Sequence, residues 1–115
     1  MILIVEDDPI ARQALQALFT ARGHAASAVS SAEEALRVLH DTTPPALVLI
    51  DIDLRGMNGL QLLRKLQKAN PRLACTLMSA NDEHNRERAK EAANVPFFSK
   101  PLNIRSLLKF VGDPH

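Results

Sequence analysis

Short, wholly apolar runs alternate along the chain with segments whose apolar residues recur at helical spacing. Two of these runs, residues 2–5 and 46–50, contain no alternating polar positions. Runs of this length that are rich in Ile, Val and Leu are typical of strands covered on both faces of a sheet. Residues 73–78, 95–98 and 25–29 are three further candidate strands.

The segments between these runs predict helices. Apolar residues three or four positions apart recur at Ile10, Ala14, Leu15, Leu18 and Phe19, then at Ala32, Ala35, Leu36 and Leu39, and then at Leu60, Leu63 and Leu66. A fourth helix is expected over residues 81–93, where only alanines are apolar within a charged segment. Such a helix buries little area and should be weakly held. A short fifth helix is expected at about residues 103–111.

Residues typical of helix ends mark the boundaries. Asp8-Pro9 predicts an N-cap followed by proline in the first turn, and Gly23 predicts the end of that helix. Ser30 or Ser31, with a glutamate three residues on, fits a capping box, and Asn70-Pro71 should end the third helix. The order is strand then helix, five times over, which predicts an α/β fold with a doubly wound parallel sheet.

The composition fits one globular domain. The chain has 115 residues, of which 46% are apolar and 23% charged. No apolar run approaches the roughly 20 residues that span a bilayer, and no secretory signal pattern opens the chain. The single cysteine, Cys75, excludes an internal disulfide framework and is expected to be an inert core thiol. We therefore expect one cytoplasmic domain over residues 1–115, without an output domain and without membrane contact.

The small net charge of +1 hides an uneven distribution. Five of the 13 acidic residues lie in two tight groups, residues 6–8 and 51–53, which leaves eight acids against 14 Lys and Arg elsewhere. A basic surface can favour an acidic partner, although scattered Lys and Arg are more simply explained as solvated. No nucleic-acid recognition motif or basic helix is present, so direct nucleic-acid binding is not expected.

Polar residues directly follow four of the five candidate strands. Glu6 and Asp7 follow the first, Asp51 the third, Ser79 the fourth and Lys100 the fifth. In a doubly wound sheet, sites form at the carboxyl ends of the strands, so the fold should gather these side chains at one edge. Clustered carboxylates repel one another unless they are protonated or bind a cation. An all-oxygen site with few protein ligands suits Mg²⁺.

This set of side chains is complete for forming an aspartyl phosphate. A carboxylate beside a divalent cation can act as a nucleophile toward a phosphoryl group. The transferred group carries negative charge on its equatorial oxygens, which need hydrogen-bond donors. Ser79 supplies a hydroxyl and Lys100 an ammonium group.

Five segments of the sequence together resemble a known family. They are IVEDD at 4–8, LIDIDL at 49–54, MNGL at 57–60, MSA at 78–80 and SKP at 99–101. In order and spacing this set resembles the receiver domain of bacterial two-component response regulators, the CheY-like superfamily. The resemblance implies a flavodoxin-like (βα)5 sandwich with a five-stranded parallel sheet in the order 2-1-3-4-5.

The resemblance also implies an acceptor and a metal site. Asp51 would accept a phosphoryl group from a partner histidine kinase or phosphotransfer protein. Mg²⁺ would be held by the side chains of Glu6, Asp7 and Asp51 and by the backbone carbonyl of Asp53.

Other positions match the switch residues of the family. Ser79 would turn toward the phosphate, Lys100 would pair with it, and the bond between Lys100 and Pro101 is usually cis in the family. Phe97 occupies the aromatic switch position, but it has no hydroxyl, so a switch that relies on a tyrosine hydrogen bond is not available. Asp53 and Asn81 match positions that tune the lifetime of the phosphate.

The chain departs from the family pattern outside the reactive residues. Arg55 stands where the family usually has proline, and Asn58 stands where it usually has aspartate. The Gly-Ala pair before the fifth strand is absent, and the region of the fourth helix is about one residue short. These departures affect the loop after Asp51 and the signalling surface around the fourth helix.

Several of these residues have a plainer interpretation. Asp8 could be a metal ligand, but an N-cap is favoured, and the Asp53 side chain could be a ligand or base, but a solvated loop residue is favoured. Arg55 could contact phosphate, but a solvated loop arginine is favoured. Ser79 could only cap the fourth helix, and Phe97 could be plain core.

We therefore predict a phosphorylatable signalling module, not an enzyme beyond assisting its own phosphoryl transfer and slow autodephosphorylation. Phosphorylation of Asp51 would shift the surface of the fourth helix, fifth strand and fifth helix, which would control an effector domain or protein and could form a homodimer. The alternatives are a non-phosphorylated receiver-like docking module and a haloacid-dehalogenase-like phosphatase. The phosphatase is disfavoured because its DxD motif follows the first strand, whereas residues 51–53 follow the third.

Overall fold

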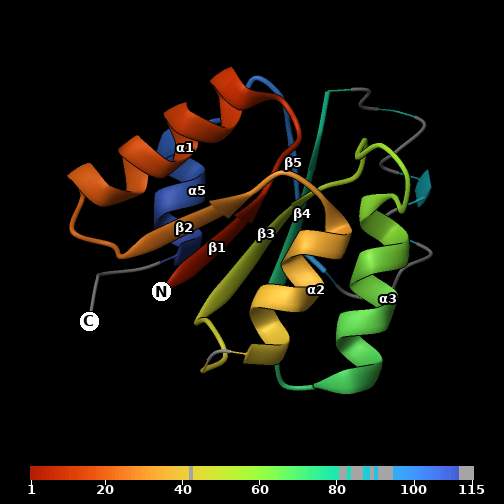
Figure 1. The fold of residues 1–115 in the computed structure, drawn as a ribbon. Coiled ribbons are helices and arrows are strands. Elements are labelled where there is room, and N and C mark those ends of the chain that lie inside the picture. Colours follow the sequence, from red (N-terminus) through yellow and green to blue (C-terminus); the bar gives the residue numbers. More distant parts are fainter. Residues whose placement is uncertain (42, 81–82, 84–86, 89, 91–94, 112–115) are drawn as a thin grey trace.

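The five apolar runs form one parallel sheet. The computed structural model describes residues 1–41, 43–80, 83, 87–88, 90 and 95–111. The strands are β1 (Ile2–Val5), β2 (Ala26–Val29), β3 (Leu47–Asp51), β4 (Cys75–Ser79) and β5 (Phe97–Ser99). They pair in the order β2-β1-β3-β4-β5, which confirms the predicted order (Figure 1).

Helices cover both faces of this sheet, as predicted. They are α1 (Pro9–Ala21), α2 (Ala32–Asp41), α3 (Gly59–Ala69) and α5 (Ile104–Val111). In the ribbon view, α1 and α5 lie on one side of the sheet, and α2 and α3 lie on the other (Figure 1). The expected fourth helix, residues 81–93, falls largely outside the described residues. None of the described helices is long and apolar enough to cross a membrane.

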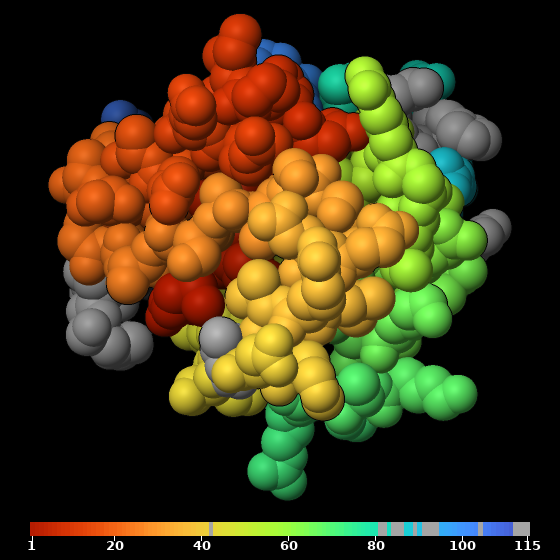
Figure 2. Space-filling model, in the orientation of Figure 1, coloured from red at the N-terminus to blue at the C-terminus, as the bar shows by residue number. Residues whose placement is uncertain are grey.

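Alternate residues of the central strands enter two separate cores. Leu3 and Ile50 pack on the side of α2 and α3, whereas Ile4 and Leu49 pack with Phe19 on the side of α1 and α5. Successive side chains of a strand point to opposite faces, so strands covered on both faces must be apolar throughout. In the space-filling view, helices α1, α2 and α3 make up most of the visible face (Figure 2).

The predicted caps bound the helices. The backbone N–H of Ile10 donates to Asp8 Oδ1 at 3.3 Å, which makes Asp8 the N-cap of α1, and Gly23 follows the helix with a φ of +87°. Asn58 caps α3 through a capping box with Gln61, in which the two backbone-to-side-chain bonds measure 2.9 and 3.0 Å. The side-chain amide of Asn58 therefore caps α3 at a position where the family usually has aspartate.

The turn before α3 packs directly on the backbone at the end of β3. The N–H of Gly59 donates to the carbonyl of Ile52 at 3.1 Å. A Cβ atom on Gly59 would overlap the carbonyl group of Asp51 and would lie 2.8 Å from the Ile52 Cα. Only glycine fits this approach, so the start of α3 is fixed against the residue that ends β3.

The substitution Gly59→Ala should therefore destabilise the domain. The overlap falls on backbone atoms that cannot turn away, and overpacking of this kind costs about 1–3 kcal/mol. That cost outweighs the gain in helix propensity, which is at most about 1 kcal/mol. Urea unfolding measures the change, and Lys65→Ala on the exposed side of the same helix should stay within about 0.5 kcal/mol of the parent. Equal stability of the Gly59→Ala and parent proteins would contradict this packing.

Glu34 closes the start of α2 with its carboxylate. Glu34 Oε2 accepts hydrogen bonds from the N–H and the hydroxyl of Ser30 at 3.1 and 2.9 Å, and the N–H of Glu34 donates to Ser31 Oγ at 3.1 Å. The backbone and then the side-chain bond from Ser30 lower the pKa of Glu34. Ser31 therefore caps α2, but the predicted capping box is incomplete, because the glutamate reaches back to Ser30 and not to the N–H of the cap residue.

The contribution of Glu34 to stability should depend on pH. Because folding lowers its pKa, the carboxylate stabilises the domain above the unfolded pKa of about 4.3 and loses that effect as the pH falls through the folded value. The difference in free energy of unfolding between parent and Glu34→Gln should be constant above about pH 5 and shrink below about pH 4. Thermal unfolding across this range measures it. Ser30→Ala, which removes one of the two donors, should retain part of the difference; no change with pH would contradict this role.

Candidate functional site

The sheet brings the predicted polar residues to one edge. Strand β1 pairs with β3, with Val5 opposite Ile50, so Glu6 and Asp7 emerge beside Asp51. Strand β4 pairs with β5, with Ser79 opposite Ser99, and the N–H of Lys100 donates to the Ser79 carbonyl at 2.8 Å. The side chains therefore converge because their strands are neighbours, as the carboxyl ends of parallel strands predict.

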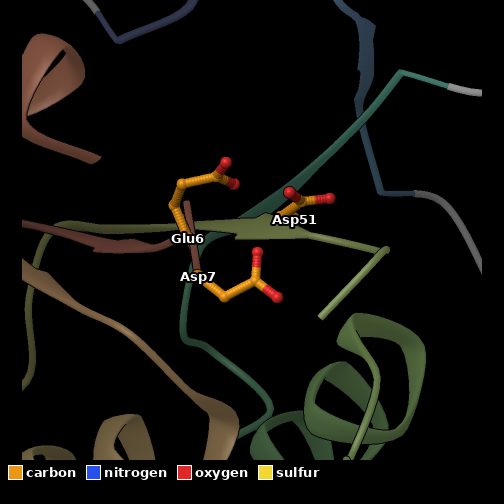
Figure 3. Close-up of side chains that lie close together, drawn as sticks. All are labelled: Glu6, Asp7 and Asp51. Atoms are coloured by element: carbon orange, nitrogen blue, oxygen red, sulfur yellow. The ribbon is translucent and has the colours of Figure 1, made fainter. Parts of the chain in front are cut away.

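Three carboxylates form the centre of this site. Figure 3 shows Glu6, Asp7 and Asp51 converging from the ends of β1 and β3, and one oxygen from each lies within 4.8 Å of the others. Glu6 and Asp51 are 1% and 3% exposed, whereas Asp7 is half-buried. Convergent carboxylate oxygens, with part of the site open to water, fit a hard divalent cation such as Mg²⁺.

The pKa values of the two buried carboxylates, Glu6 and Asp51, are shifted in opposite directions. Burial, and then the hydrogen bond and charge of Asp51, raise the pKa of Glu6 to about 8. Burial also works to raise the pKa of Asp51, but hydrogen bonds from Glu6, Lys100 and the N–H of Asp53 together hold it below its usual value. Two adjacent buried carboxylates separate in this way because they cannot both be ionised at low cost. The opposite directions of the two pKa shifts favour Glu6 over Asp51 as the group that holds a proton.

Lys100 provides the positive charge of the site. Its Nζ atom lies 2.8 Å from Asp51 Oδ2 and 3.2 Å from each carboxylate oxygen of Glu6. Burial works to lower the pKa of Lys100, but the hydrogen bond and charge of Asp51, followed by those of Glu6, raise it above the usual value. The side chain is therefore a stable ammonium group. The Lys100–Pro101 peptide bond is cis.

Asp53 contacts both the Asp51 carboxylate and the Ser79 hydroxyl. Its backbone N–H donates to Asp51 Oδ1 at 2.8 Å, and its Oδ2 accepts a hydrogen bond from Ser79 Oγ at 2.6 Å. Ser79 is fully buried. Asp53 is exposed, in agreement with the solvated loop side chain that the sequence favours, and its carboxylate also accepts a hydrogen bond from the end of β4.

Two arginines support the loops that carry the carboxylates. Arg12 Nη1 donates to the backbone carbonyls of Glu6 and Asp7 at 3.1 and 3.3 Å, a role that the sequence reasoning missed. A cation near the start of a helix is unfavourable for the helix dipole, so the unusual position of Arg12 was the feature of the sequence that could have indicated this role. The backbone N–H of Arg55 donates to Asp7 Oδ2 at 3.3 Å, while its side chain is exposed as predicted.

The remaining sequence candidates lie outside the carboxylate cluster. Asp8 is exposed and caps α1, as favoured. Phe97 is half-buried and packs on the core that faces α2 and α3. Asn81 lies outside the described residues. Burial raises the pKa of the Cys75 thiol to about 11, so this cysteine is the inert core residue that was expected.

Comparison with known proteins agrees with this geometry. Residues 2–112 match the response regulator receiver domain family. The transcriptional regulatory protein AruR of Pseudomonas aeruginosa is 35% identical over 111 residues, which cover 93% of this chain and 46% of AruR. The response regulator protein FleR of the same organism is 37% identical, over 96% of this chain and 23% of FleR. The chain thus spans half or less of the length of these curated relatives.

Solved structures show the same fold. A response regulator receiver protein from Pseudomonas putida superposes with a TM-score of 0.87 at 27% identity, covering 96% of this chain and 93% of that one. The receiver domain of the Brucella abortus protein NtrX superposes with a TM-score of 0.85 at 27% identity, with the same coverage of both chains. The chain therefore belongs to the response regulator receiver domain family, the signalling modules of two-component systems.

Proposed function

We propose that this receiver domain is a phosphorylation switch whose acceptor is Asp51. The observation that carries the proposal is the buried carboxylate of Asp51, which lies 2.8 Å from the Lys100 ammonium and beside Glu6 and Asp7. The donor is the phosphohistidine of a partner histidine kinase or phosphotransfer protein. The site is a poor general base, because Asp51 is held as an anion by two hydrogen bonds, but a carboxylate anion is a competent nucleophile.

The transfer exchanges one bond to phosphorus for another. A carboxylate oxygen of Asp51 attacks the phosphorus atom, the P–N bond of the phosphohistidine breaks, and the leaving histidine nitrogen takes a proton from the solvent. Asp51 is already ionised and gives up none. Lys100 and Ser79 offer donors to the oxygens of the arriving group. Glu6, Asp7, Asp51 and the backbone carbonyl of Asp53 would hold Mg²⁺, which would supply positive charge against the phosphoryl oxygens when bound.

The phosphorylated state ends when water attacks the phosphorus atom and the Asp51 carboxylate leaves. We assign the tuning of this slow autodephosphorylation to Asp53 and Asn81, on the family pattern. A haloacid-dehalogenase-like phosphatase is not favoured, because Asp51 ends the third strand of a receiver sheet. A docking module that is never phosphorylated is the alternative that experiment must exclude.

The output of the switch is proposed to pass through β5 and α5. Ser79 and Lys100 share a backbone hydrogen bond, so movement of Ser79 toward a phosphoryl group is proposed to be coupled to β5, the strand that begins at Phe97. The surface formed by the fourth helix, β5 and α5 would then control an effector domain or a separate protein, or form a homodimer. The greater length of the relatives named as transcriptional regulators supports an effector. The switch is proposed to act in the cytoplasm, without contacting membrane or nucleic acid itself.

Incubation with acetyl phosphate and Mg²⁺ should add one phosphoryl group to the parent protein. Asp51→Asn should add none, because the amide cannot act as the nucleophile, and removal of Mg²⁺ with EDTA should suppress the addition. Intact mass spectrometry measures all three samples. A parent protein that binds Mg²⁺ but gains no phosphoryl group would contradict the proposal, and the docking module would then be the better interpretation.

Lys100→Ala should slow phosphorylation of Asp51 by roughly 100–1,000-fold, the usual loss when one aligned donor is removed from a reaction centre. The rate of mass gain under the same conditions measures the effect. Lys109→Ala, an exposed lysine of α5, is the matched control and should react at the parental rate. Far-ultraviolet circular dichroism checks that each variant is folded. A parental rate in folded Lys100→Ala would refute the role of the ammonium group.

A further inference from the structure

We propose that the Asp53 carboxylate holds the Ser79 hydroxyl by a hydrogen bond in the unphosphorylated domain, a contact that we call the latch. This carboxylate competes with the phosphoryl group for the one hydrogen bond that the hydroxyl can donate. The inference rests on the proposed function, because it concerns how the same site moves to its phosphorylated state. It assigns to the Asp53 side chain a positioning role that acts through Ser79.

The contact has the geometry of a strong hydrogen bond. Ser79 Oγ donates to Asp53 Oδ2 at 2.6 Å, within the range of about 2.5–2.7 Å for a hydroxyl bound to a carboxylate. Ser79 is fully buried at the end of β4, while Asp53 is exposed in the loop after β3. The hydroxyl is buried, and the Asp53 carboxylate accepts the hydrogen bond that it donates.

Asp53 also lies next to the acceptor itself. Its backbone N–H donates to Asp51 Oδ1 at 2.8 Å. The pairing of Asp51 with Met78 places the two strand ends side by side, so the loop that begins at Asp51 passes the hydroxyl of the following residue, Ser79. One residue thus contacts the acceptor through its backbone and the switch hydroxyl through its side chain.

The competition follows from the chemistry of a hydroxyl group. Serine has a single O–H proton and donates one full hydrogen bond at a time. When Ser79 donates to an oxygen of the phosphoryl group on Asp51, it must release the Asp53 carboxylate. An ionised acceptor is roughly twice as strong as a neutral one, so the carboxylate resists this release more than an amide would. The Asp53 side chain therefore sets how readily the switch engages.

A double-mutant cycle on the full chain isolates this contact. The four proteins are the parent, Asp53→Asn, Ser79→Ala and the double variant. The readout is the dissociation constant for beryllofluoride, a phosphoryl mimic that binds the acceptor carboxylate, in saturating Mg²⁺. Asp53→Asn keeps the shape of the side chain and weakens the acceptor. The cycle is needed because Asp53→Asn removes a negative charge, and this alone favours binding of the anionic beryllofluoride even if Asp53 does not hold Ser79.

The latch predicts that Asp53→Asn tightens beryllofluoride binding more when Ser79 is present than in the Ser79→Ala background. We expect the two effects to differ by about fivefold, in the range of coupling between residues in direct contact. Ser79→Thr, which keeps the hydroxyl, should restore the coupling. The dissociation constant for Mg²⁺ is measured for each protein, because the backbone of Asp53 is also a proposed ligand.

Three outcomes would overturn the inference. An equal effect of Asp53→Asn in both backgrounds would assign the change to charge alone. Weaker beryllofluoride binding that depends on Ser79 would show that the contact favours the bound state. Absence of beryllofluoride binding by the parent protein would remove the proposed function and this inference together, whereas binding without coupling would remove only the latch.

Discussion

The structure depends on two buried carboxylates that share one half-buried cation. Glu6 and Asp51 are almost inaccessible to water, and Lys100 lies within 3.2 Å of both. Buried charges are tolerated only when they are paired or protonated, and both solutions are used here, since the pKa of Glu6 is raised to about 8 while that of Asp51 is lowered. The sheet order serves this arrangement. Lys100 follows β5, which is separated from β3 by β4, so its side chain spans the end of β4 to reach Asp51.

The site has little freedom because its supports are backbone groups. The carbonyls of Glu6 and Asp7 accept from the Arg12 guanidinium, and the acceptor carboxylate takes the N–H of Asp53. Gly59 packs so tightly on the end of β3 that a methyl group does not fit. Hydrogen bonds to fixed backbone groups hold side chains ready for reaction without further ordering, which is how binding sites reduce the cost of reorganisation. Against this background, the proposed switch requires the Ser79 hydroxyl to change its hydrogen-bond partner.

Much of the fold could be predicted from the residues because burial leaves a direct mark on sequence. Strands β1 and β3 are covered on both faces and read as unbroken apolar runs, whereas the edge strands β2 and β5 are only partly buried and read less clearly. The side chains of the site could be found because each directly follows a strand. The contacts of Arg12 and Asp53 could not, because they depend on the path of a loop in space, and residue order along the chain does not specify that path.

The bond between Arg55 and Asp7 changes how substitution at position 55 should be interpreted. The family usually has proline there, and proline has no N–H to donate, whereas this chain donates to a carboxylate of the metal cluster from that backbone position. The exposed guanidinium draws attention to charge, yet the contact to Asp7 belongs to the main chain. At position 55, the difference that matters for this contact is therefore between proline, which has no backbone N–H, and every other residue. The charge of the side chain does not affect it. Two homologues with equal side-chain polarity at this position can therefore differ in whether the backbone holds the carboxylate equivalent to Asp7. A substitution score based on side-chain similarity does not detect this difference.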